Sequence, residues 1–171
     1  MGDTAMTVVV IIAAVAIMGI FPLMGAANQT DDTTNLTVQT ATTEFVNEIR
    51  STGTLTMNNY ENFTATLAAT GNSYDTNIEV QIADGNLAKK ESTTSSDKIY
   101  LTKYNTQIME ELNGNNGGKV TFNEGDVISV SVQNTNTTIA QQLRNIINKV
   151  TGNNSSAIVG EATGMITRTG N

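Results

Sequence analysis

The stretch Ala5–Ala27, AMTVVVIIAAVAIMGIFPLMGAA, decides how this chain folds. Almost every residue in it is apolar, and about 20 apolar residues in a helix span the hydrocarbon core of a bilayer. No Lys or Arg precedes Arg50, so the basic front end of a signal peptide and the positive flank of an ordinary membrane anchor are both absent. We therefore expect a mature form from which a basic leader has been removed. A helix that is apolar all round must be buried in lipid or against other helices.

The helical pattern resumes after a polar patch at residues 28–35. Apolar residues then recur at intervals of three and four, which predicts one apolar stripe on a helix. Gly53 is a plausible end. The sequence thus predicts one helix from about residue 3 to about residue 51, roughly 70 Å long at 1.5 Å per residue. The residues of the stripe are Leu36, Val38, Ala41, Phe45, Val46 and Ile49.

Two residues in the apolar stretch and just before it are unusual. Pro22 lacks an amide hydrogen, so we expect it to kink or locally unwind the helix. Asp3 carries the only ionisable side chain before Asp31. An unpaired carboxylate is costly to bury, and the free α-amino group of Met1 in a neighbouring copy would be a suitable partner for it.

Composition excludes several classes of function. The net charge of −7 and the pI of about 4.4 do not suit a nucleic-acid-binding protein, which needs a basic face. The chain has no Cys, so it has no disulfide, thiolate metal site or catalytic thiol, and it has no His, the commonest general base. Asp31–Asp32 and residues 123–126 lack the spacing of a calcium loop. We expect no enzyme activity, no metal and no cofactor.

Residues 54–171 predict an α+β head with a mainly antiparallel sheet and short helices. Alternating apolar residues predict a strand at 78–82, and Thr56 is a suitable N-cap for a helix that Gly71 ends. Further expectations are a loop at residues 85–97, a helix capped by Thr102 and carrying Ile108 and Leu112, a hairpin of residues 120–122 and 127–132, a helix at 139–150, and short strands at 157–159 and 165–167.

The whole pattern resembles the type IV pilin superfamily. The features that carry the resemblance are an apolar N-terminal helix with an acidic residue near its start, Pro22, an amphipathic second half and a β-rich C-terminal part. The segment Thr40–Asp75 is also similar to pilin-like proteins of tight-adherence loci in Gram-positive, clostridia-type bacteria. Mature pilins typically have Glu at position five, whereas this chain has Ala5 and places its carboxylate at Asp3.

The resemblance implies a structural subunit of an extracellular filament, a helical homopolymer on the cell surface. Residues 1–53 would be a spine helix, in which residues 5–27 form the filament core and residues 36–51 pack on the head of residues 54–171. The precursor would sit in the cytoplasmic membrane, where a prepilin peptidase and the pilus assembly machinery act on it. Expected assembly residues are Met1, Asp3, Val8, Val9, Ile11, Ile12, Val15, Ile17, Ile20, Phe21, Pro22 and Leu23, and expected helix–head packing residues are Leu36, Val38, Ala41, Phe45 and Ile49.

Two other classes of function fit the same pattern. A single-pass anchor could hold a monomeric binding or sensor domain outside the cytoplasm, because an apolar stretch of this length also suits a bilayer. An ordinary secreted adhesin domain is the third possibility. Filaments on the producing cells distinguish the first reading from both of these.

Overall fold

The computed structural model describes residues 2–83, 100–114, 117–136 and 159–170. Within these ranges it describes no side chain for residues 2, 3, 16, 17, 20, 21, 24, 27, 28, 83, 100 and 159. The predicted loop at 85–97 and the predicted helix at 139–150 therefore lie outside the described residues. Contacts between Cα atoms divide the chain into two compact units, one of residues 1–34 with 137–156 and one of residues 35–136 with 157–171. The predicted division at residue 53 stays a prediction.

Helix α1 comprises Gly2–Thr52. Its backbone remains α-helical through Pro22, so the local unwinding that we expected at this residue does not occur. Gly53 follows the helix with a φ of 66°, and its amide donates a hydrogen bond of 2.8 Å to the carbonyl oxygen of Ile49. This left-handed conformation favours glycine and closes the helix where the sequence predicts its end.

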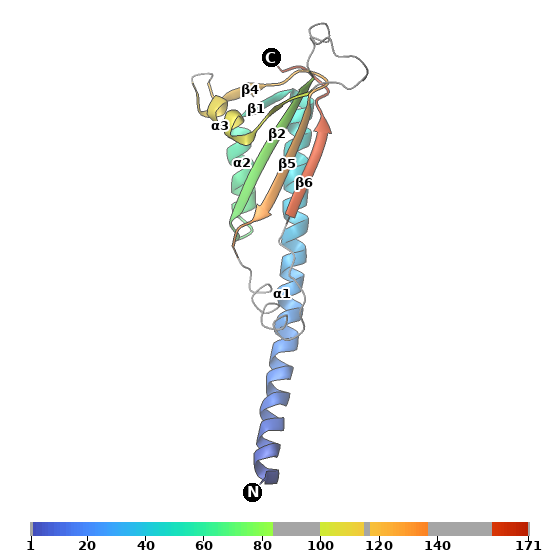
Figure 1. Cartoon of the computed structure of the whole chain (residues 1–171), viewed down its shortest axis with the longest axis vertical. Coiled ribbons are helices and arrows are strands. Elements are labelled where there is room, and N and C mark those ends of the chain that lie inside the picture. Colours follow the sequence, from blue (N-terminus) through green and yellow to red (C-terminus); the bar gives the residue numbers. More distant parts are fainter. Residues whose placement is uncertain (1, 84–99, 115–116, 137–158, 171) are drawn as a thin grey trace, which may run out of the picture. The chain divides into compact units, whose positions relative to one another are not determined.

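The second unit contains a four-stranded antiparallel sheet with the order β3-β2-β5-β6 (Figure 1). Its strands are β2 (Tyr74–Ala83), β3 (Tyr100–Lys103), β5 (Val127–Asn134) and β6 (Val159–Met165). Strand β2 contains the predicted strand at 78–82, and Ile78 lies opposite Val130 of β5. Strands β1 (Thr54–Thr56) and β4 (Lys119–Thr121) form a separate two-stranded sheet.

Two short helices belong to the same unit. Helix α2 (Met57–Ala68) begins after Thr56, whose side-chain oxygen accepts a hydrogen bond of 3.2 Å from the amide of Asn59, so the predicted cap is confirmed. Helix α3 (Asn105–Asn113) begins after Tyr104, whose amide donates to the side-chain oxygen of Gln107 at 3.1 Å. The predicted cap at Thr102 is wrong, because this residue belongs to β3 and pairs with Gln81.

One hydrophobic core joins these elements, and residues 35–52 of α1 supply one side of it. Val38, Ala41, Phe45 and Ile49 are buried there among side chains of α2, α3 and the sheet. Leu36, which we expected to pack on the head, is instead 68% exposed. The reason is helical geometry: two positions correspond to about 200° of rotation, so Leu36 points away from the face that carries Val38.

Two strand predictions for the second half of the chain are wrong. Residues 120–122 and 127–132 do not form a hairpin, because β4 pairs with β1 whereas β5 lies between β2 and β6. The buried carboxylate of Asp126 accepts a hydrogen bond of 2.8 Å from the Asn123 amide and stabilises a turn that redirects the chain. The short strands expected at 157–159 and 165–167 are also misplaced, because β6 occupies Val159–Met165, the residues between them; residues 166 and 167 lie outside it, and residues 157 and 158 lie outside the described residues.

Strand β6 lies close against α1 because two of its residues are glycines. A Cβ atom at Gly160 would lie 2.8 Å from both the Thr42 hydroxyl oxygen and a methyl group of Val38, and one at Gly164 would overlap the Arg50 side chain. At this short separation Arg50 Nε donates to the Met165 carbonyl oxygen at 2.8 Å. The described residues therefore form an α+β fold with antiparallel sheets and short helices, which confirms the predicted class.

We predict that Gly160→Val lowers the free energy of unfolding by about 1–3 kcal/mol, because the added side chain forces α1 and β6 apart. Urea unfolding of the full chain in detergent, followed by circular dichroism, measures the change. Thr163→Val on the outer face of the same strand is the matched control. Equal stability of the Gly160→Val variant and the wild type would show that the close approach is not needed.

Candidate functional site

Two surfaces of the described residues are candidates for function, and each lies within one compact unit. The first consists of exposed apolar side chains on the N-terminal part of α1, and we call it the apolar surface. Nine of its side chains are 54–79% exposed. They are Met6, Val8, Val9, Val10, Ile11, Ile12, Val15, Met18 and Leu23.

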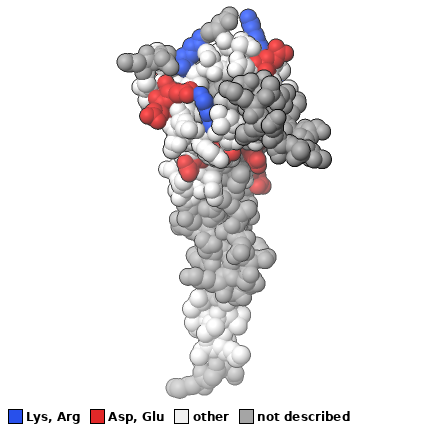
Figure 2. Space-filling model, turned by 45° about the horizontal axis from the view of Figure 1, so that its top comes forward, with Lys and Arg blue, Asp and Glu red and all other residues white. Residues whose placement is uncertain are grey.

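The apolar surface is large for a soluble protein. No residue between Thr4 and Thr30 is charged, and the described ones among them are white in Figure 2. Single exposed apolar side chains are normal, but a contiguous patch of them marks a surface that contacts protein or membrane. Its side chains surround the helix, since Val8 to Ile12 are consecutive residues and cover more than one full turn.

The apolar surface includes six of the predicted assembly residues, and Pro22 is also exposed. The side chains of Met1, Asp3, Ile17, Ile20 and Phe21 lie outside the described residues, so their roles stay predictions. The sequence prediction omitted Met6, Val10 and Met18, although the all-apolar run around them was a sufficient signal. Within the part of the chain that the structure describes, no helix has both the length and the apolar character needed to cross a membrane.

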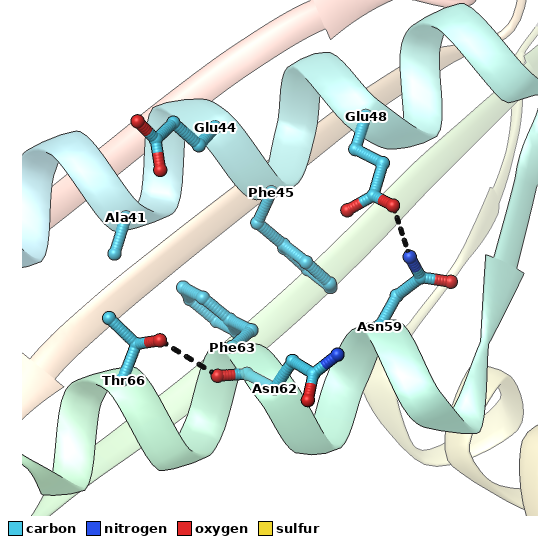
Figure 3. Close-up of a pocket in the computed structure, with 8 residues that line it drawn as sticks. All are labelled: Ala41, Glu44, Phe45, Glu48, Asn59, Asn62, Phe63 and Thr66. Carbon is cyan, nitrogen blue, oxygen red and sulfur yellow. Dashed lines mark hydrogen bonds between the residues drawn. The ribbon is translucent and has the colours of Figure 1, made fainter.

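The second surface is a groove of about 170 Å³ between α1 and α2, which we call the α1–α2 groove (Figure 3). Its floor is formed by Phe45 and Phe63, whose rings stack with centroids 4.3 Å apart and an angle of 6° between their planes. Both rings are only 4% exposed, so they contribute to the core as well as to the groove. The stacked pair therefore fixes the position of α2 on α1.

The rim of the α1–α2 groove is polar and its charges have one sign. Glu44 and Glu48 lie on the α1 side, one turn apart, and both are exposed. Glu48 accepts a hydrogen bond from the side-chain amide of Asn59 on the facing helix (Figure 3). The remaining lining residues are Ala41, Asn62 and Thr66. The groove thus combines an apolar floor with two carboxylates that repel each other.

Sequence analysis assigned Ala41 and Phe45 to helix–head packing, which agrees with their burial, but it did not predict the groove. The available signal was the pair Glu44 and Glu48, which flanks the core residue Phe45 on the helix. The groove also needs Phe63, and its position beside Phe45 depends on how α2 packs. Among the described residues, no group of three or more acidic side chains is placed to bind a metal ion.

We predict different consequences for apolar substitutions on the two surfaces. Ile12→Asn changes the free energy of unfolding by less than about 0.5 kcal/mol, because the side chain is 63% exposed. Phe45→Ala lowers it by about 3–5 kcal/mol, because it removes a buried aromatic side chain. Urea unfolding of both variants in the same detergent compares them, and a large loss for Ile12→Asn would show that Ile12 is part of a folded core.

Comparison with known proteins identifies no relative of this chain. No family model matches it, no curated protein matches it, and no solved structure matches it. The functional interpretation therefore depends on the residues and on the two surfaces described above.

Proposed function

We propose that this chain is the structural subunit of an extracellular, type IV pilin-like filament, which assembles through its N-terminal apolar helix. The observation that supports this most strongly is the apolar surface, with nine large apolar side chains more than half exposed on one helix. Each such side chain is stabilised by roughly 1.5–3 kcal/mol when it is removed from water. Copies of the same helix can provide that cover in a bundle.

In the proposed mechanism the precursor is held in the cytoplasmic membrane by residues 5–27. A prepilin peptidase removes a basic leader, and the assembly machinery transfers the subunits from the bilayer into a central bundle of α1 helices. Transfer from lipid gains little hydrophobic energy, because lipid tails are as apolar as the helix. Packing and electrostatic pairing must therefore determine how neighbouring helices align.

Asp3 is the proposed source of that pairing in the bundle. Its carboxylate would form an ion pair with the charged α-amino group of Met1 from a neighbouring subunit, so that neither charge is buried without a partner. The heads, with their surface rich in Asn and Thr, would form the outer layer. The alternative function is a monomeric, single-pass domain anchored outside the cytoplasm.

We predict that Asp3→Ala abolishes filaments or reduces them at least tenfold, whereas the head folds normally. Negative-stain electron microscopy of material sheared from producing cells counts the filaments, and circular dichroism checks the fold. Asp32→Ala on the same helix is a matched control that removes one carboxylate elsewhere. Normal filaments from the Asp3→Ala variant would refute the pairing.

The wild-type chain provides the test of the function itself. Wild-type cells without any fibres, together with a purified protein that stays monomeric in detergent, would favour the anchored domain instead. Mass spectrometry of the N-terminus from sheared fibres adds a second readout, because the filament proposal requires a newly exposed α-amino group.

A further inference from the structure

The α1–α2 groove has the chemistry of a binding site for one particular side chain. Its floor is apolar, one rim carries the carboxylates of Glu44 and Glu48, and the other carries amide and hydroxyl groups of α2 (Figure 3). Arginine matches this combination. Its methylene groups pack on apolar surface, while its weakly hydrated, planar guanidinium donates several hydrogen bonds to carboxylates.

Among the described residues, no Lys or Arg side chain forms an ion pair with either carboxylate. Lys103 of β3 is paired with Glu111 of α3 at 2.6 Å. Glu48 has a neutral partner in Asn59. The repulsion between Glu44 and Glu48 is therefore not compensated by a positive charge among the residues that the structure describes.

Among the described residues, Arg168 is the cation that remains available. Four Lys or Arg residues lie in the described ranges, and three of them have partners. Arg50 is bonded to Met165 and Asn47, Lys103 is paired with Glu111, and Lys119 also has a partner. The side chain of Arg168 is exposed, and no described group bonds to its guanidinium.

The backbone on both sides of Arg168 is held in place. The Thr167 amide donates to the carbonyl oxygen of Arg50 at 3.0 Å, and the Thr169 hydroxyl accepts from the Glu124 amide at 3.1 Å. The Gly170 amide donates to the carbonyl oxygen of Phe122 at 3.0 Å. A side chain presented from a fixed backbone loses less conformational freedom on binding, which favours its use as an anchor.

One copy of the chain does not place Arg168 in its own groove. Arg168 belongs to the tail that follows β6, and β6 contacts the face of α1 that carries Gln39 and Arg50. Glu48 is nine positions from Gln39, about two and a half turns, so it points to the opposite side of the helix. The backbone of Arg168 lies beside Gly53, just after the end of α1, and within its own copy Arg168 has no ion pair or hydrogen bond with Glu44 or Glu48.

We propose that the α1–α2 groove binds the Arg168 side chain of a second copy of this chain, with Glu44 and Glu48 as its ionic partners. This inference rests on the proposed function, because it assigns a contact between the heads of neighbouring subunits. A contact between two different surfaces is heterologous, and heterologous contacts that do not close into a ring extend into open helical polymers.

Charge reversal tests the contact. The double variant Glu44→Lys with Glu48→Lys, and separately Arg168→Glu, should each reduce the number of filaments per cell at least fivefold. Combining all three substitutions should restore filaments at least partly, because the charges are again complementary. The matched control is Glu61→Lys with Glu110→Lys, which makes the same change in net charge at exposed positions of α2 and α3 outside the groove.

A second measurement does not depend on filament number. Arg168→Lys retains the positive charge, and a carbodiimide joins a lysine amine to a carboxylate that touches it. Sheared filaments of this variant should give a ladder of cross-linked subunits on a denaturing gel, and mass spectrometry should find residue 168 linked to residue 44 or 48. Adding Glu44→Gln and Glu48→Gln should remove that link.

The outcomes separate this inference from the proposed function. Filaments that form normally in the charge-reversed variants, without a link between residue 168 and the groove, would overturn the inference and leave the filament function intact. A link found only within single subunits would also overturn it. Wild-type cells that make no filaments would refute the proposed function, and the contact between heads with it.

Discussion

The structure of the second unit depends on one packing constraint: a single stripe of α1 must be buried against the four-stranded sheet. Val38 and Ile49 are completely buried at its two ends, with Phe45 between them. Because the stripe occupies one face of the helix, the neighbouring faces remain free for other contacts. The stripe also contacts α2 through the stacked rings of Phe45 and Phe63, and at its other end Val38 lies against Gly160 of β6.

The same constraint explains how the sheet is protected at one edge. Among the described strands, β6 has a neighbour on one side only, and such an edge exposes unpaired backbone groups to other chains. Gln39 of α1 satisfies two of these groups at Glu161: its amide nitrogen donates to the carbonyl oxygen at 2.7 Å, and its side-chain oxygen accepts from the amide at 3.1 Å. The side chain thus replaces part of a missing strand, and Gly160 provides the space that α1 needs to come so close.

Local patterns in the sequence were sufficient for some elements and not for others. The stripe of α1, the cap at Thr56 and the alternation in β2 were predictable because each signal lies within a few neighbouring residues. The pairing of Leu55 with Val120 was not, since it joins segments far apart in the sequence. The sequence predicted short strands at 157–159 and 165–167, whereas β6 occupies the residues between them, with Gly160 and Gly164 inside it at the contact with α1. The α1–α2 groove was not predictable either. It needs Phe63, and the position of α2, which carries Phe63, is determined only by the folded core.

The two candidate surfaces differ in how strictly each would orient a neighbouring copy of the chain. An apolar surface such as that of residues 6–23 favours any arrangement that excludes water, so it provides stability without a unique alignment of neighbours. A groove with two carboxylates and a stacked aromatic floor binds a single cationic side chain in few orientations, which selects one alignment among many. In the proposed filament the apolar side chains of the helices would supply cohesion, and the pairing of Asp3 together with the contact between heads would supply the register. Arg168 suits the second role because its backbone is already fixed by Arg50, Glu124 and Phe122, so the position of the head determines the position of the charge.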